Sequence, residues 1–223
     1  AEPLAASALA NGLFFLVMVL GIGLSHAITA LVAIAKGEGD DEKCGIIARQ
    51  GLIVNVVFGF ILTITTFGTS ELVGFMNQEK VVADLTESYL KILSLSIIPF
   101  MIFQTYRQFL EGLSDTKTPM YLAIAANIVN IFGNWIMIFG NLGFPALGLD
   151  GAGFATFTTR IFLGFSLMFI TVYSPKYKKF DPSLPLLSFL NAWAYPINFS
   201  PQSRHLRDRD LIHTCPKHEH AYR

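Results

Sequence analysis

The chain has 223 residues, of which 52% are hydrophobic and only 14% are charged, whereas soluble domains typically carry about a quarter charged residues. Its acidic and basic residues balance to a net charge of zero, which gives no reason to propose a nucleic-acid partner. Two cysteines, Cys44 and Cys215, stand far apart in unlike surroundings, so we expect neither a disulfide framework nor a metal site. Long uncharged apolar stretches favour a membrane protein.

The first two apolar segments are each long enough to cross a bilayer as a helix. The first covers about residues 7–35 and the second about residues 50–68, with a polar loop of glycine and acidic residues between them. Thr63, Thr65 and Thr66 lie within the second segment. They can return their hydroxyls to their own helix backbone, so they need no functional role.

A third apolar segment, about residues 88–106, contains a proline near its middle. A connector over residues 69–85 precedes it, and Asp84-Leu-Thr-Glu87 fits a capping box at its start. Pro99 removes a backbone hydrogen bond, so the sequence predicts a helix kink there. Membrane helices tolerate such breaks near a cavity, and the Gln104 amide is costly to expose to lipid. We therefore assign Gln104 to an internal cavity.

A short polar hinge separates the third and fourth segments. Arg107 and Glu111 stand one helical turn apart where the apolar residues stop, and Gly112 can adopt the left-handed conformation that ends a helix. Thr118-Pro119 is typical of an N-cap followed by proline at the first helical position. The pattern predicts a short loop between two membrane spans.

The fourth segment, about residues 119–139, carries three asparagines and no charge. Asn127, Asn130 and Asn134 recur at i, i+3 and i+7, which places three amides on one side of a helix. Buried amides without partners cost a few kcal/mol, so this side must meet another helix or a hydrated cavity. Interhelical hydrogen bonding and cavity lining are equally compatible with this spacing.

The fifth segment, about residues 151–173, opens with the small residues of Gly151-Ala-Gly-Phe-Ala-Thr156. Arg160 falls about a third of the way along it. We expect its side chain to extend to the outer membrane surface. A guanidinium satisfied by the carbonyls of neighbouring helices is the next alternative.

The distribution of basic residues orients these five spans. The loops after the first, third and fifth spans hold eight of them, whereas those after the second and fourth hold Lys80 alone. The eight residues are Lys36, Lys43, Arg49, Arg107, Lys117, Lys176, Lys178 and Lys179. Because short loops rich in lysine and arginine stay in the cytoplasm, the first residue should lie outside the cell membrane.

The residues after Asp181 have a different character. Residues 182–223 combine several prolines, histidines and arginines with too few apolar residues to span a bilayer. Cys215-Pro-Lys-His218-Glu-His220 lacks the second half of a metal site, so we expect no metal there. We interpret residues 182–223 as a disordered tail unrelated to the preceding spans.

The hinge motif Arg107-Gln-Phe-Leu-Glu-Gly-Leu-Ser-Asp-Thr-Lys-Thr-Pro-Met120 resembles a loop of the multidrug and toxic compound extrusion (MATE) transporters. That loop joins the fourth and fifth helices of the family, and the likeness is nearest to the NorM-like branch. It extends over residues 1–181 and includes the small-residue run from Gly151 to Thr156. The order and spacing of these pieces carry the resemblance.

The resemblance implies an all-α, polytopic transmembrane bundle that corresponds to helices two to six of a MATE N-lobe. It implies a multi-pass protein of the inner membrane that exports organic, often cationic, drugs or toxins in exchange for Na⁺ or H⁺, with no other cofactor. The family's first helix and its whole C-lobe would be missing partners, besides the lipid bilayer.

The resemblance also assigns roles to single residues. Asn130 and Asn134 match positions that line the N-lobe cavity, which favours cavity lining over packing for the asparagines. Arg160 is an unfavourable neighbour for organic cations, so a role in binding them ranks last. The alternative to a transporter is a non-transporting truncated membrane module or assembly partner. An enzyme is not expected, because the spans contain no cluster of acidic and histidine side chains.

Overall fold

The computed structural model describes residues 2–75 and 79–180, and these residues are largely helical. The predicted tail, residues 182–223, with Cys215 lies outside this part of the chain. The described residues form six α-helices: α1 (Glu2–Gly37), α2 (Asp41–Leu72), α3 (Lys80–Leu95), α4 (Ile97–Gly112), α5 (Lys117–Phe139) and α6 (Gly148–Tyr173). Three short 3₁₀ turns, Val73–Phe75, Asn141–Gly143 and Lys178–Phe180, accompany them. The all-α prediction is confirmed for these residues, which contain no strand.

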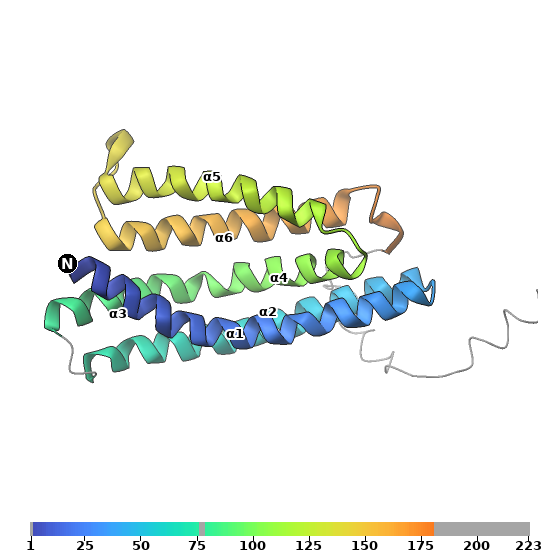
Figure 1. Cartoon of the computed structure of the whole chain (residues 1–223), viewed down its shortest axis with the longest axis horizontal. Coiled ribbons are helices and arrows are strands. Elements are labelled where there is room, and N and C mark those ends of the chain that lie inside the picture. Colours follow the sequence, from blue (N-terminus) through green and yellow to red (C-terminus); the bar gives the residue numbers. More distant parts are fainter. Residues whose placement is uncertain (1, 76–78, 181–223) are drawn as a thin grey trace, which may run out of the picture. The chain divides into compact units, whose positions relative to one another are not determined.

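The helices provide up to five membrane spans. α1, α2, α5 and α6 are each long and apolar enough to cross a bilayer, and α3 and α4 together make a fifth span bent by 43°. In Figure 1 the start of α1, the end of α2 and the α5–α6 connection lie at one end of the bundle, as up-and-down spans require. The helices are longer than the predicted spans. The predicted spans were limited to the apolar stretches, whereas the helices continue through end turns that contain charged residues.

The predicted connector over residues 69–85 is too long at both ends. α2 continues to Leu72 and α3 begins at Lys80, so Asp84 and Glu87 lie inside a helix and do not cap one. The reason is a buried stripe with helical spacing along α3. Its members are Val82, Ala83, Thr86, Tyr89, Leu90 and Leu93. Burial of this stripe keeps the polar first turns helical.

The bend between α3 and α4 lies at Ser96, three residues before Pro99. Pro99 has no N–H to donate to the carbonyl of residue 95, so the regular helical ladder stops there. Ser96 closes the last turn of α3 instead, since its N–H donates to the Leu93 carbonyl at 3.0 Å. The kink predicted from Pro99 therefore corresponds to a bend one turn earlier.

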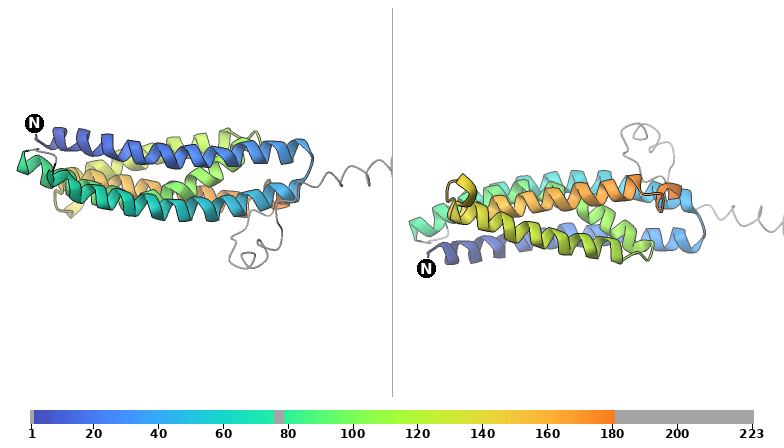
Figure 2. Two further views of the ribbon diagram at one scale, coloured as in Figure 1. Left: turned by 90° about the horizontal axis from the view of Figure 1, so that it is seen from below. Right: turned by 90° about the horizontal axis from the view of Figure 1, so that it is seen from above.

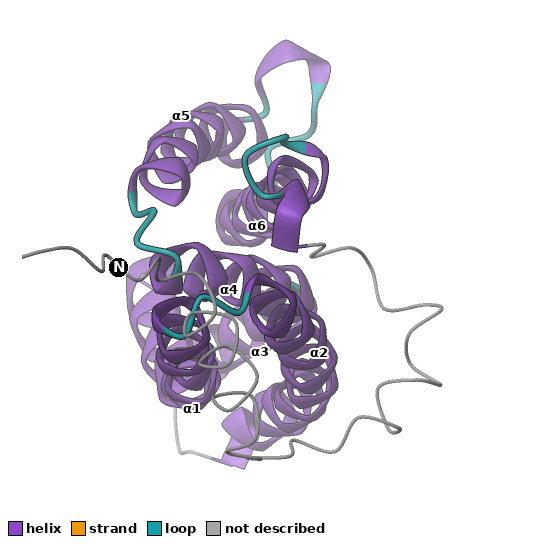
Figure 3. Cartoon of the chain, turned by 90° about the vertical axis from the view of Figure 1, so that its right-hand side faces the viewer, coloured by secondary structure: helices purple, strands orange, loops and turns teal. Residues whose placement is uncertain are grey.

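α4 lies among α1, α2 and α6, and α5 packs chiefly against α6. Figure 3, which looks along the bundle, shows α1 to α4 grouped together with α5 and α6 beside them. Figure 2 shows the long helices running side by side. α4 supplies several of the largest fully buried side chains, among them Met101, Tyr106, Phe109 and Leu110. The core of the bundle is thus centred on the helix that follows the bend.

Two glycines of α6 allow close helix contacts. A Cβ atom at Gly164 would lie 2.5 Å from the carbonyl oxygen of Pro99 in α4. A Cβ atom at Gly151 would overlap the carbonyl oxygen of Met137 in α5. Neither neighbour can rotate away, because both are backbone atoms. The small residues of α6 therefore set its distance from two neighbouring helices.

Candidate functional site

Two of the three predicted asparagines form a hydrogen-bonded chain between α5 and α6. The Asn134 amide donates to the Asn130 side-chain oxygen at 3.1 Å, and the Asn130 amide donates to the Thr159 hydroxyl oxygen at 3.2 Å. The Thr159 hydroxyl in turn donates to the Ala155 carbonyl at 2.8 Å. We call Asn130, Asn134 and Thr159 the amide site.

The amide site has unused hydrogen-bonding capacity. Asn130 and Asn134 are half-buried, and the Asn134 side-chain oxygen has no hydrogen-bond partner among the described residues. An unsatisfied buried acceptor costs about 1–3 kcal/mol, so a donor or a cation at this oxygen would be stabilised. The site contains only neutral oxygen and nitrogen groups.

The other predicted cavity residues lie elsewhere. Asn127 is exposed on α5 and Gln104 is buried on α4, and no hydrogen bond of the described residues joins either one to the amide site. The Gln104 side-chain oxygen is buried without a partner. The i, i+3, i+7 spacing thus identified one side of α5, but it could not show which amides reach α6. Thr159 was missed, although a threonine in an apolar span is a plausible partner for an amide.

Arg160 does not extend to the membrane surface, so that prediction is wrong. It is the thirteenth residue of α6, counted from Gly148, in a helix of 26 residues. Its guanidinium donates to the Ser96 hydroxyl oxygen at 2.6 Å, and its central carbon lies 4.8 Å from the Phe14 ring and 5.1 Å from the Phe100 ring. The side chain points toward the α3–α4 bend because Ser96 supplies an acceptor there.

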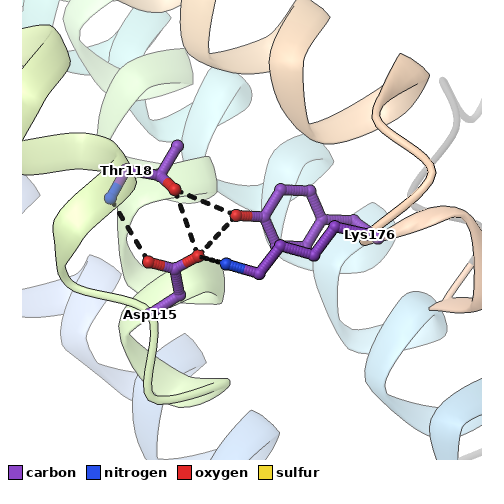
Figure 4. A network of polar contacts seen from close by, with 4 residues as sticks. Asp115, Thr118 and Lys176 are labelled. Atoms are coloured by element: carbon purple, nitrogen blue, oxygen red, sulfur yellow. Dashed lines mark hydrogen bonds and ion pairs between the residues drawn. The ribbon is translucent and has the colours of Figure 1, made fainter.

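A second polar network joins the α4–α5 loop to the residues after α6 (Figure 4). The Asp115 carboxylate accepts hydrogen bonds from the Thr118 N–H at 3.2 Å and the Tyr177 hydroxyl at 2.5 Å, and it pairs with the Lys176 ammonium. Burial raises the pKa of the Asp115 carboxyl, but the hydrogen bonds from Lys176, Tyr177 and Thr118 outweigh it and hold the pKa well below its usual value.

This network corrects two predictions about the hinge. Asp115, not Thr118, caps the first turn of α5, which begins at Lys117. The left-handed residue after α4 is Ser114, with φ of 65°, while Gly112 remains helical. The predicted helical pair of Arg107 and Glu111 is present at 2.8 Å. Local spacing therefore identified the hinge. It did not identify Asp115 as the residue that caps α5, or the contact of Asp115 with the distant Tyr177.

The residues of the described ranges contain no cluster of three or more histidine, cysteine or acidic side chains that could hold a metal. Cys44 is buried, and its thiol contacts the Val32 carbonyl. Within the described residues, the features we consider for binding chemistry are the neutral amides, Arg160 and the Asp115 network.

Comparison with known proteins gives three concordant findings. A family model described as MatE matches residues 1–136. A probable multidrug resistance protein NorM from Photorhabdus laumondii is 32% identical over 183 residues, which are 82% of this chain and 40% of that protein. A multidrug resistance protein NorM from Photobacterium profundum is 28% identical over 179 residues, 80% of this chain and 39% of that protein.

Solved structures show the same fold. The inward-facing conformation of a multidrug resistance MATE family transporter matches with a TM-score of 0.72 at 22% identity, over 93% of this chain and 43% of that one. The outward-facing conformation of such a transporter matches with a TM-score of 0.70 at 22% identity, over 93% and 45%. The chain thus spans about two fifths of the length of the relatives it matches.

Proposed function

The chain belongs to the MATE family of transporters, and from this premise we propose that it forms part of the N-lobe of a cation-coupled multidrug exporter. In this proposal the complete protein exports organic, often cationic, compounds in exchange for Na⁺ or H⁺. The names of the NorM relatives support the multidrug part of the proposal. The described helices would make one wall of the central cavity.

The amide site is the observation that carries this proposal. It places two half-buried amides against α6 and leaves the buried oxygen of Asn134 without a partner. Neutral oxygens can accept hydrogen bonds from an organic ammonium group, or coordinate a metal cation, without a fixed negative charge. A cation is released more easily from neutral oxygens than from a carboxylate. A transport site needs this property because it must bind its ligand and then release it.

The alternative is that the amide site only holds α5 and α6 together. Alanine variants of two asparagines in the complete transporter test this alternative. Asn130→Ala should lower dye export per protein molecule about tenfold, because it removes the central group of the amide site. Asn55→Ala is the matched control, since the Asn55 amide donates to Thr105 at 2.9 Å in a fully buried contact between α2 and α4. It should lower protein abundance and leave specific export unchanged. If Asn130→Ala behaves in the same way, the amide site only holds helices together.

The inner-membrane orientation is also part of the proposal. The α1–α2 loop, the α4–α5 loop and the end of α6 lie at the same end of the bundle (Figure 1). The eight basic residues that the sequence places on the cytoplasmic side lie in these connections or in the helical turns next to them. The end of the bundle that holds the start of α1 would then face outward.

Cysteine labelling tests this orientation. Cys44 is fully buried and cannot serve as the reporter, so Cys44 and Cys215 are first replaced by alanine. Glu42→Cys then places an exposed thiol in the first turn of α2, and Phe144→Cys places one in the α5–α6 loop. An impermeant maleimide added to intact cells should label Phe144→Cys at once and Glu42→Cys only after the membrane is opened. The reverse pattern would invert the topology.

A further inference from the structure

We propose that Tyr177 is a positioning residue for the amide site. Its hydroxyl ties the start of α5 to the segment that follows α6, and this tie keeps Asn130 within hydrogen-bond distance of Thr159. The inference rests on the proposed export function and adds to it a residue that acts at a distance from the site. Asp115, Thr118 and Tyr177 form what we call the polar clasp.

The Tyr177 hydroxyl is held in place by packing and by its own turn. Tyr177 is 3% exposed and belongs to the same apolar core as Phe109 of α4 and Phe180. The Phe180 ring meets the Phe109 ring edge to face at 6.0 Å, and the Phe180 N–H donates to the Tyr177 carbonyl at 3.0 Å. Close-packed side chains of this kind occupy fixed positions, so the segment after α6 presents the hydroxyl as a rigid donor.

The start of α5 receives that donor through Asp115 and Thr118. The Tyr177 hydroxyl donates to the Asp115 carboxylate at 2.5 Å, and its oxygen lies 3.0 Å from the Thr118 hydroxyl oxygen (Figure 4). The same carboxylate accepts from the Thr118 N–H at 3.2 Å. The Asp115 side chain is only 11% exposed, and a hydrogen bond to a charged acceptor is strong where little water competes for it. The clasp thus restrains the first turn of α5.

The amide site lies between this clasp and a second anchor near the other end of α5. There the Leu147 N–H donates to the Met137 carbonyl at 3.0 Å, and a Cβ atom at Gly151 would overlap the oxygen of that carbonyl. At 1.5 Å per residue, Asn130 is about 18 Å from Thr118 and about 11 Å from Met137 along α5. α5 is therefore held at both ends, with the amide site between them.

The contact between the amide site's two helices is sensitive to the position of α5. The Asn130 amide meets the Thr159 hydroxyl oxygen at 3.2 Å, the upper end of the usual range of about 2.7–3.2 Å for such a hydrogen bond. A binding site must be held within about 0.5 Å of its working geometry. With the clasp open, α5 can pivot about its other anchor and carry Asn130 away from α6. Loss of the Tyr177 hydroxyl should therefore weaken the amide site without removing any of its groups.

Spin-label distances in the purified 223-residue chain test whether the clasp holds α5. The two cysteines are replaced by alanine, and labels are attached to one of two pairs of exposed positions on α5 and α6. Tyr121→Cys with Phe169→Cys reports the clasp end, and Phe139→Cys with Phe154→Cys reports the anchored end. Tyr177→Phe should add a longer component to the first distance distribution and leave the second unchanged.

Two further variants locate the effect. Tyr106→Phe is the matched control, because Tyr106 is a buried tyrosine whose hydroxyl has no hydrogen-bond partner among the described residues, and it should change neither distribution. Thr118→Val removes the other hydroxyl of the clasp and should act like Tyr177→Phe, so it decides the question if Tyr177→Phe fails to fold. An unchanged first distribution refutes the inference. Equal broadening of both distributions also refutes it, because that result indicates general loosening of the bundle.

Dye export by the complete transporter tests the link from the clasp to the amide site. Tyr177→Phe should raise the KM for a cationic dye about fivefold and lower kcat less than about twofold, because the site is displaced while all its groups remain. Tyr106→Phe should leave both constants unchanged. A spin-label shift without a change in KM would refute the link. If the unaltered transporter exports no dye, the proposed function fails, whereas the spin-label distances still decide whether Tyr177 positions α5.

Discussion

Gly164→Val is expected to destabilise the bundle by about 3 kcal/mol or more, the upper end of the cost of overpacking a close contact. A Cβ atom at this position lies 2.5 Å from the Pro99 carbonyl oxygen, and the next two atoms it meets also belong to the Pro99 backbone. No rotamer change can relieve that overlap, so α6 must move away from α4. The movement would also displace Arg160, one turn earlier on α6, from Ser96.

The measurement is the melting temperature of the purified chain in detergent, with Gly23→Ala as the matched control. Gly23 also lies within a membrane helix, but a Cβ atom there has no neighbour within 4 Å. Alanine at Gly23 should be neutral or stabilising by about 0.5–1 kcal/mol, because glycine disfavours the helix. If the Gly164→Val variant has the same melting temperature as the unaltered chain, α4 and α6 are not in the close contact described.

Features that depend on neighbouring residues in the sequence could be predicted from it. The apolar stretches located the spans, and the predicted i,i+4 pair of Arg107 and Glu111 is present at 2.8 Å. The hydroxyls of Thr63, Thr65 and Thr66 return to their own helix at 2.8–2.9 Å, as expected. Each of these contacts lies within one or two helical turns, so local spacing is sufficient to find it.

Features that depend on contacts between distant segments could not be predicted in this way. Arg160 points inward because Ser96, 64 residues earlier, offers an acceptor at the α3–α4 bend. The first turns of α3 are helical because their buried stripe packs against α1 and α2, although their polar residues suggested a loop. The choice between packing and cavity lining for Asn130 likewise depends on where α6 places Thr159. Hydropathy and capping patterns carry no information on such pairings.

Asp115→Ala is expected to destabilise the chain by about 2–4 kcal/mol, the second largest effect we predict. It removes the cap of α5, which contributes about 1 kcal/mol, and the hydrogen bond from Tyr177 to a charged acceptor, which contributes about 1.5–3 kcal/mol. The Lys176 side chain is 63% exposed, so solvent screens its ion pair with Asp115 and the pair adds little stability. Lys176→Ala should therefore be nearly neutral, and equal losses in the two variants would contradict this division of the network.

The pH dependence of the same variants separates the charge of Asp115 from its capping role. The pKa of the folded Asp115 carboxyl is lowered, so its charge contributes stability above the unfolded pKa of about 3.9, and that contribution is lost as the pH falls through the folded value. Asp115→Asn keeps a side chain that can cap α5 but has no charge. The difference in melting temperature between the unaltered chain and Asp115→Asn should be constant from about pH 6 to 8 and shrink below about pH 4. A difference that grows in acid would mean that the carboxylate is not stabilised by Lys176, Tyr177 and Thr118, and that the loop between α4 and α5 is held to the end of α6 by other contacts.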